Sequence, residues 1–330
     1  MPGGQERALR RRIGSTQNIK KITRAMELIS ATRVVKAQQA ANDARPYSEH
    51  ITQVITDLAS GGVAVDHPLL RQPDDVKVVG IVVLSSDRGM AGAYNASVIR
   101  AAEREIQAAR AEDRGYRLVT IGRRAASYFR FRGYDITASF DGMTDRPTYE
   151  DAREIANKVV ELFMGDVDQI DLVYTQFISM GTQKVTVRRF LPLETEAEEE
   201  SEATKSSGPS AQFEFEPSPG RVLESLLPRY VESRLFSALL DAAASEHASR
   251  QRAMKSATDN AEDLILKLSR RMNQARQDAI TTEIMEIIGG AEALSADRGD
   301  DPEQLLLDHL SSDPFPSLLT LHQFSHSPES

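Results

Sequence analysis

The chain contains no cysteine and no tryptophan among its 330 residues. Without thiols it can form no disulfide framework, no cysteine-ligated zinc site and no thiol switch, a composition that fits a reducing compartment. No segment approaches the roughly 18 consecutive apolar residues of a membrane span, and the opening residues MPGGQERALRRR lack the apolar core of a signal peptide. We therefore expect no direct membrane insertion and a location in the cytosol or on the cytosolic face of a membrane.

The chain has fewer basic than acidic residues, and its formal net charge is -9. This balance argues against a protein whose whole surface binds nucleic acid, although it allows a local basic patch. Such a patch occurs near the N-terminus, where Glu6 and Glu27 are the only acidic residues among many basic ones. The basic residues are Arg7, Arg10, Arg11, Arg12, Lys20, Lys21, Arg24, Arg33 and Lys36. They could form a solvated helix face, contact phosphates, or meet a protein partner with acidic side chains, and periodicity does not choose among these.

Helix breakers are scarce in two long segments at the ends of the chain. Between residues 6 and 59 only Gly14 and Pro46 occur, and between residues 229 and 288 there is neither glycine nor proline. At roughly 1.5 Å per residue, the second segment could form a helix about 90 Å long. Such lengths exceed what a globular core requires.

Both segments carry apolar or small side chains in steps of three and four, a pattern that we call the seam. The N-terminal seam comprises Ile19, Ile22, Met26, Ile29, Ala37, Ala40, Ala44, Tyr47, Ile51, Val54 and Leu58. The C-terminal seam comprises Met254, Ala257, Ala261, Leu264, Leu268, Met272, Ala275 and Ala279. This spacing is typical of coiled coils, so we predict that the two helices pack against each other as a long antiparallel coiled coil.

The middle of the chain has a different pattern. The stretch VKVVGIVVLSS at 76–86 is a nearly continuous β-branched run, as found in a strand buried on both faces. Similar strand signals occur at 116–121, 170–177 and 185–191, with helical stretches at 95–110, 124–132 and 149–164. Alternation of this kind predicts a central Rossmann-like α/β domain.

The predicted fold class is therefore α/β plus a long antiparallel coiled coil. We expect an N-terminal coiled-coil helix at 1–62, a linker at 63–75, the α/β domain at 76–193, an acidic and Ser/Pro-rich surface excursion at 194–220, a C-terminal coiled-coil helix at 221–290, and a disordered extension at 291–330.

No motif in the chain predicts chemistry. The turn SSDRGMAGAYN has the spacing Gly89-x-x-Gly92, which is neither G-x-G-x-x-G nor a Walker A pattern, and tight-turn packing explains it better than a phosphate. His322 and His326 are four residues apart in a polar tail, without a third ligand at useful spacing. We predict no catalytic residue, no cofactor and no metal. A nucleotide-binding α/β enzyme and a basic coiled-coil protein that binds nucleic acid remain the alternatives.

Four stretches resemble the gamma subunit of the F-type ATP synthase. They are IGSTQNIKKITRAMELISATRVVKAQ (13–38), SSDRGMAGAYN (85–95), YVESRLFSALLDAAASEHASRQRAMKSATDNAEDLI (230–265) and ARQDAITTEIMEIIGGAEA (275–293). The last contains the C-terminal signature I-T-x-E-x-x-E-x-x-x-G-A, from Ile280 to Ala291. The chain departs from the family pattern at Met90-Ala91, where many members have Leu-Cys, and beyond Leu294, where a typical member has ended.

The resemblance implies a non-catalytic subunit that forms the central rotor shaft of a proton-translocating ATP synthase. In the family, the terminal helices form a coiled coil inside the ring of alpha and beta subunits, and the α/β domain sits with epsilon on the membrane rotor ring of c subunits. The shaft transmits torque between the two rings, which couples proton flow to ATP synthesis. We accordingly expect a peripheral subunit on the cytoplasmic face of a bacterial plasma membrane, with no nucleic-acid partner.

The residues expected to contact the catalytic ring follow from the resemblance and from the basic N-terminal helix. They are Lys20, Lys21, Arg24, Met26, Arg33, Lys36, Arg250, Arg276, Gln277, Thr281 and Glu283.

Overall fold

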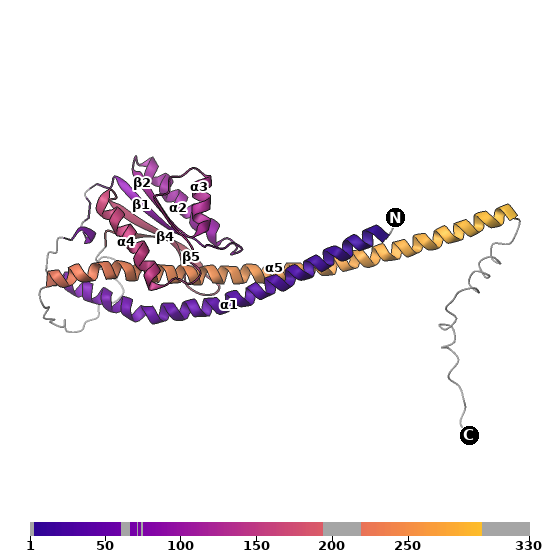
Figure 1. Cartoon of the computed structure of the whole chain (residues 1–330), viewed down its shortest axis with the longest axis horizontal. Coiled ribbons are helices and arrows are strands. Elements are labelled where there is room, and N and C mark those ends of the chain that lie inside the picture. Colours follow the sequence, from indigo (N-terminus) through magenta and orange to yellow (C-terminus); the bar gives the residue numbers. More distant parts are fainter. Residues whose placement is uncertain (1–2, 61–66, 71, 74, 194–218, 299–330) are drawn as a thin grey trace, which may run out of the picture. The chain divides into compact units, whose positions relative to one another are not determined.

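The computed structural model describes residues 3–60, 67–70, 72–73, 75–193 and 219–298 (Figure 1). The chain divides into two compact units, Met1–Lys20 with Asn260–Ser330 and Lys21–Asp259. The predicted excursion at 194–220 lies outside the described residues except for Pro219 and Gly220, which begin a helix. The predicted extension lies outside them beyond residue 298.

A mixed sheet of five strands forms the centre of the second unit. The strands are β1 (Val78–Leu84), β2 (Gly115–Ile121), β3 (Ala138–Phe140), β4 (Gln169–Phe177) and β5 (Gln183–Leu191). Their order is β3-β2-β1-β4-β5, and only β4 and β5 pair antiparallel. The parallel part has the order of one half of a doubly wound sheet. The predicted α/β class is therefore confirmed.

Helices cover both faces of this sheet. They are α2 (Tyr94–Ala111), α3 (Arg123–Phe131) and α4 (Tyr149–Gly165), and a short 3-10 helix η1 (Pro68–Leu70) precedes β1. Because successive strand residues point to opposite faces, Ile81 and Val83 pack in one core cluster with residues of α2 and α3. Val82 and Leu84 pack in a second cluster with residues of α4 and of the two long helices. This two-sided burial explains the uninterrupted apolar run of β1.

The long helices are α1 (Gly3–Ser60) and α5 (Pro219–Arg298). Pro46 and Pro228 lie inside them without ending either one. Helix α5 continues through Arg298, so residues 291–298 are helical where we expected the disordered extension to begin. None of the helices in the described ranges combines the length and apolar character needed to cross a bilayer.

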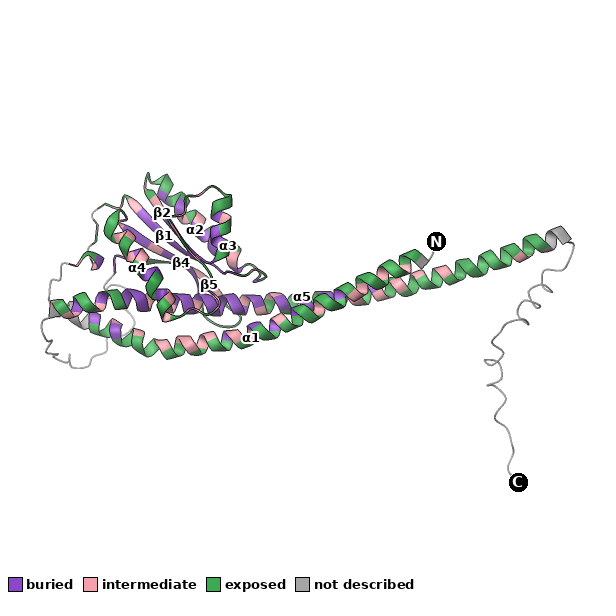
Figure 2. Ribbon diagram, viewed as in Figure 1, coloured by how far each residue is buried: buried purple, intermediate pink, exposed green. Residues whose placement is uncertain are grey.

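The buried side of α1 differs from the predicted seam. Ile19, Ile22 and Ile29 are 52%, 60% and 52% exposed. Among residues 4–50 of α1 the buried positions are instead Thr16, Thr23, Glu27, Ser30 and Val34, and Figure 2 shows α1 as mostly exposed or intermediate. The N-terminal seam prediction was therefore wrong at Ile19, Ile22 and Ile29, because the small Thr23 side chain contacts Thr258 of α5 instead. It is confirmed at Ile51, which is 6% exposed.

The predicted seam of α5 agrees better with the structure. Met254, Ala261 and Leu268 are buried. Ala257, Met272, Ala275 and Ala279 are half-buried. Leu264 is the exception, with 42% of its surface exposed. The alanine and methionine residues of the predicted seam therefore lie on the buried side of α5. Of its two leucines, Leu268 lies on that side and Leu264 does not.

Candidate functional site

The eleven predicted contact residues fall into three classes of exposure. The exposed ones are Lys21, Arg24, Lys36, Arg276, Gln277, Thr281 and Glu283. Lys20, Met26 and Arg33 are half-buried, and Arg250 is buried. Most of these side chains are therefore available on the surface of α1 or α5.

Two of the basic residues on α1 are held by carboxylates. The Arg24 guanidinium donates to both carboxylate oxygens of Glu27 at 2.8 and 2.9 Å. The Lys20 ammonium lies 3.1 Å from the Glu262 carboxylate on α5. Glu27 itself is only 7% exposed, so the pair anchors the Arg24 guanidinium at α1, while 58% of the Arg24 side chain stays exposed.

Arg33 and Arg250 make their contacts inside the second unit. Arg33 forms an ion pair with Asp145, in the segment between β3 and α4. Arg250 pairs with Glu246 at 2.6 Å and also donates to the carbonyls of Gly89 and Arg88 at 3.3 Å. Its side chain is 6% exposed. The structure thus differs from the expectation of a surface contact at Arg250, because this guanidinium satisfies backbone groups of the SSDRG turn.

The SSDRG turn is held by side chains from several segments. Its backbone N–H groups at Ser86 and Asp87 donate to Asn95 Oδ1 and Thr144 Oγ1 at 2.9 and 3.0 Å. Gly122 approaches so closely, at φ +91°, that an added Cβ would lie 2.4 Å from the Ser85 carbonyl oxygen. Both amides are therefore engaged within the protein and do not point to a phosphate. This geometry supports the tight-turn interpretation.

Asp87 organises the turn through its carboxylate. It accepts hydrogen bonds from the Arg123, Gly142 and Thr144 amides and from the Thr144 hydroxyl, at 3.0 to 3.2 Å. Burial alone would raise the pKa of Asp87, but the hydrogen bonds, from Gly142 first, lower it below its ordinary value. A carboxylate with this many donors remains ionised and ties the turn to the start of α3 and to residues 142–144.

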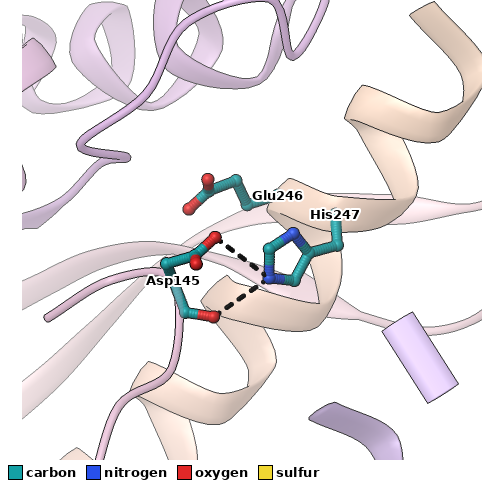
Figure 3. Close-up of side chains that lie close together, drawn as sticks. All are labelled: Asp145, Glu246 and His247. Carbon is teal, nitrogen blue, oxygen red and sulfur yellow. Dashed lines mark hydrogen bonds and ion pairs between the residues drawn. The ribbon is translucent and has the colours of Figure 1, made fainter. Parts of the chain in front are cut away.

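A buried polar cluster connects this region to α5, and Figure 3 shows its three members Asp145, Glu246 and His247. Their potential ligand atoms all lie within 4.8 Å of one another. The His247 Nε2 atom is 3.1 Å from the Asp145 carbonyl oxygen, and its Nδ1 atom faces the Arg250 guanidinium at 3.3 Å. Because arginine can only donate, Nδ1 must accept, and the proton resides on Nε2. In this tautomer Nε2 donates to Asp145 and offers no lone pair to a metal.

Burial shifts the titration of the cluster. It raises the pKa of Glu246 to about 7, although Arg250 acts in the opposite direction. It lowers the pKa of His247, which is therefore neutral near pH 7. Within the described part of the chain, Asp145 Oδ1 and Glu246 Oε2 accept no hydrogen bond. The residues thus form a buried, hydrogen-bonded charge cluster in which one oxygen of each carboxylate has no hydrogen-bond donor within the described residues.

The sequence alone predicted no role for Asp87, Asp145, Glu246 or His247. The available signal was the polar sequence SEHASR at 245–250 within an alanine-rich stretch of α5, together with the spacing of Glu246 and Arg250 by four residues. Their partners lie far away in the sequence, so only the fold reveals the cluster.

Comparison with known proteins identifies the family. A family model described as ATP synthase matches residues 5–294. The ATP synthase gamma chain of Frankia casuarinae is 48% identical over 298 residues, which cover 89% of this chain and 99% of the relative. That of Mycolicibacterium smegmatis is 47% identical over 307 residues, covering 88% and 98%.

Solved structures share the fold. A chain from the Euglena gracilis mitochondrial ATP synthase matches with a TM-score of 0.62 and 17% identity, covering 91% of this chain and 97% of its own length. A chain from the central stalk and c-ring of the Tetrahymena thermophila enzyme gives a TM-score of 0.54 and 21% identity, covering 72% and 99%. The family match and the relatives together confirm the resemblance found in the sequence: the chain belongs to the ATP synthase gamma chain family, and its function is that of the central rotor shaft of the synthase.

Proposed function

We propose that α1 and α5 form an antiparallel coiled coil that turns inside a ring of alpha and beta subunits. The observation that carries this proposal is the contact pattern within the second unit. Thr23 Oγ1 lies 2.8 Å from Thr258 Oγ1, whereas Ser48 and Thr52 of α1 line a cleft with Tyr230 and Arg234 of α5. Residue numbers therefore rise along α1 as they fall along α5.

The side chains turned away from α5 provide the surface for the ring. Ile19 and Ile22 are more than half exposed beside Lys21 and Arg24 on α1. Apolar side chains in water lower the free energy when a partner covers them, by about 25 cal/mol per Å². The isoleucines that do not face α5 are thus suited to contact another subunit, and the neighbouring cations to align it.

The C-terminal part of α5 offers a second surface of the same kind. Ile280, Ile284 and Met285 are 49%, 50% and 63% exposed, and the predicted contact residues Arg276, Gln277, Thr281 and Glu283 lie among them. Contacts that form and break during rotation should be individually weak. Exposed ion pairs, each worth at most about 1 kcal/mol, meet that requirement.

The α/β domain, in this proposal, engages epsilon and the membrane ring of c subunits. The chain itself is then a non-catalytic, peripheral subunit on the cytoplasmic face of a bacterial plasma membrane. Protons crossing 100 mV release about 2.3 kcal/mol per charge, and the coiled coil passes that work to the catalytic ring. Co-purification tests the assignment: tagged chain should recover alpha, beta and epsilon subunits with ATP-driven proton pumping, and recovery of the chain alone under assembly conditions would refute it.

The isolated chain should hydrolyse no ATP. The Ser86 and Asp87 amides of the SSDRG turn are hydrogen-bonded within the protein, and the sequence carries no residue pattern for phosphoryl transfer. Phosphate release is measured with pure chain and, as the positive control, with the assembled complex. Turnover by the pure chain at a rate typical of enzymes, on the order of 10 per second, would contradict the proposal.

Substitution of Met26 by lysine should uncouple the motor more than it prevents assembly. Met26 is half-buried on α1, between the exposed Arg24 and the buried Glu27. A new ammonium there must be desolvated whenever a subunit covers it, which should weaken torque transfer. ATP hydrolysis and proton pumping are measured in the same vesicles, with Met26→Leu as the control. A proportional fall in both rates would argue against a coupling role.

A further inference from the structure

Helix α3 has one face that does not contact the sheet. Its buried residues are Ala125, Ala126 and Phe129, and Phe129 and Ala125 belong to the core cluster with β1 and α2. The exposed residues are Arg123, Arg124, Ser127, Arg130 and Phe131. These positions repeat at helical spacing, so they form one continuous stripe, which we call the α3 face.

Phe131 is the most unusual member of the α3 face. It is 88% exposed, more than any other large apolar residue in the described ranges. Phe129, two residues earlier, is fully buried between the rings of Tyr128 and Tyr134. Leaving a phenylalanine in water forgoes roughly 2 to 3 kcal/mol of burial free energy. The Phe131 side chain therefore contributes no burial free energy to the core, and it remains available to a partner.

The charged residues of the α3 face are all arginines, while Arg132, which follows Phe131, pairs with Glu103 at 3.5 Å. Within the described part of the chain, Arg124 and Arg130 form no ion pair, and the Arg123 guanidinium is 3.8 Å from Asp87. This concentration of arginine occurs in a chain of net charge -9. Guanidinium groups bind carboxylates with two parallel hydrogen bonds. Arginine and aromatic residues are also enriched at the centres of protein interfaces.

We propose that the α3 face is a docking surface for an acidic protein segment that places an apolar side chain against Phe131. The helix spans 9 residues, or about 13 Å, which matches roughly four residues of an extended segment. A nucleic acid fits less well, because it needs a longer track of cations than one short helix offers and the chain as a whole has a net charge of -9. The proposed function assigns partners to the α/β domain but no contact residues, so the inference goes beyond it by naming a surface and the chemistry of the segment that binds there.

Fluorescence anisotropy of the full chain with labelled synthetic peptides tests the proposal. The probe is a short peptide of glutamates around a central leucine, compared with the same peptide carrying serine for leucine and with single-stranded DNA of equal charge. We expect the leucine peptide to bind most tightly. Phe131→Ser, Arg124→Glu and Arg130→Glu should each weaken it about tenfold.

Arg221→Glu is the charge-matched control, because Arg221 is an exposed arginine on α5. It should leave binding within about twofold of the parent chain. Unchanged circular dichroism of the variants verifies the fold, as expected for side chains at the surface. The proposal is overturned if the leucine peptide does not bind, if the serine peptide or DNA binds as tightly, or if Arg221→Glu weakens binding as much as the α3 variants.

Discussion

Replacing Arg250 with alanine is expected to lower the free energy of unfolding by about 3 to 5 kcal/mol, the usual cost of removing one partner from a buried ion pair. Glu246 is 1% exposed, so its carboxylate would remain buried without the cation that now lies 2.6 Å away. The Gly89 carbonyl would lose its donor as well, whereas the Arg88 carbonyl would still accept from the Ser86 hydroxyl. The loss therefore comprises an unpaired charge and one unsatisfied backbone acceptor.

Urea unfolding of the full chain, followed by circular dichroism, measures this change. Arg270→Ala is the matched control, because Arg270 is an exposed arginine on the same helix, and it should cost no more than about 0.5 kcal/mol. The decrease in unfolding free energy caused by Arg250→Ala should be smaller near pH 6 than near pH 8. At the lower pH Glu246 is protonated, so removing Arg250 leaves no unpaired buried charge. An equal and small effect of both substitutions would show that the Arg250 hydrogen bonds contribute nothing to stability.

The sheet could be predicted from the sequence because its strands carry a local signal. The continuous run at 76–86 gave β1 to within a few residues, and its two-sided burial is what such a run requires. The long helices were also evident, since few breakers interrupt them. The start of α5 and its continuation past residue 290 were less accurate, because helix ends depend on local caps and on tertiary contacts.

The packing of α1 could not be predicted in the same way. Its apolar residues occur on more than one side, and we assigned Ile19, Ile22 and Ile29 to the contact with α5. The structure buries Thr23 and Ser30 instead. Periodicity assumes that a chain buries its own apolar residues, but a helix that serves a larger assembly keeps some of them for other subunits.

The charge cluster of Asp145, Glu246 and His247 could not be predicted from the sequence for a different reason. Asp145 follows β3, whereas Glu246 and His247 lie on α5, and no spacing rule connects these segments. The same holds for Arg250, whose role as a surface contact was inferred by resemblance and whose actual partners include the backbone of the SSDRG turn. Contacts between distant segments depend on the fold, which a linear pattern does not encode.

The titration of Glu246 should make stability depend on pH. Burial raises its pKa from 4.5 to about 7, so between these values the folded protein holds a proton that the unfolded chain has released. Stability contributed by this group is complete below about pH 4.5 and is lost as the pH rises through about 7. His247 acts in the opposite direction, because its lowered pKa makes stability rise with pH below 6.5. The charged groups that face Glu246 are Arg250, Asp145 and Asp87.

Glu246→Gln should remove this dependence, so the stability of the variant relative to the parent should rise as the pH increases from about 5 to 8. The glutamine oxygen can still accept from Arg250, and its amide can donate toward Asp145 Oδ1, which has no hydrogen-bond partner within the described residues. The measurement is the difference in unfolding free energy between variant and parent from about pH 5 to 8, because the contribution of His247 cancels in that difference. Glu262→Gln, at an exposed glutamate of α5, should give a flat difference. A flat difference for Glu246→Gln as well would mean that Glu246 remains ionised in the folded protein throughout this range.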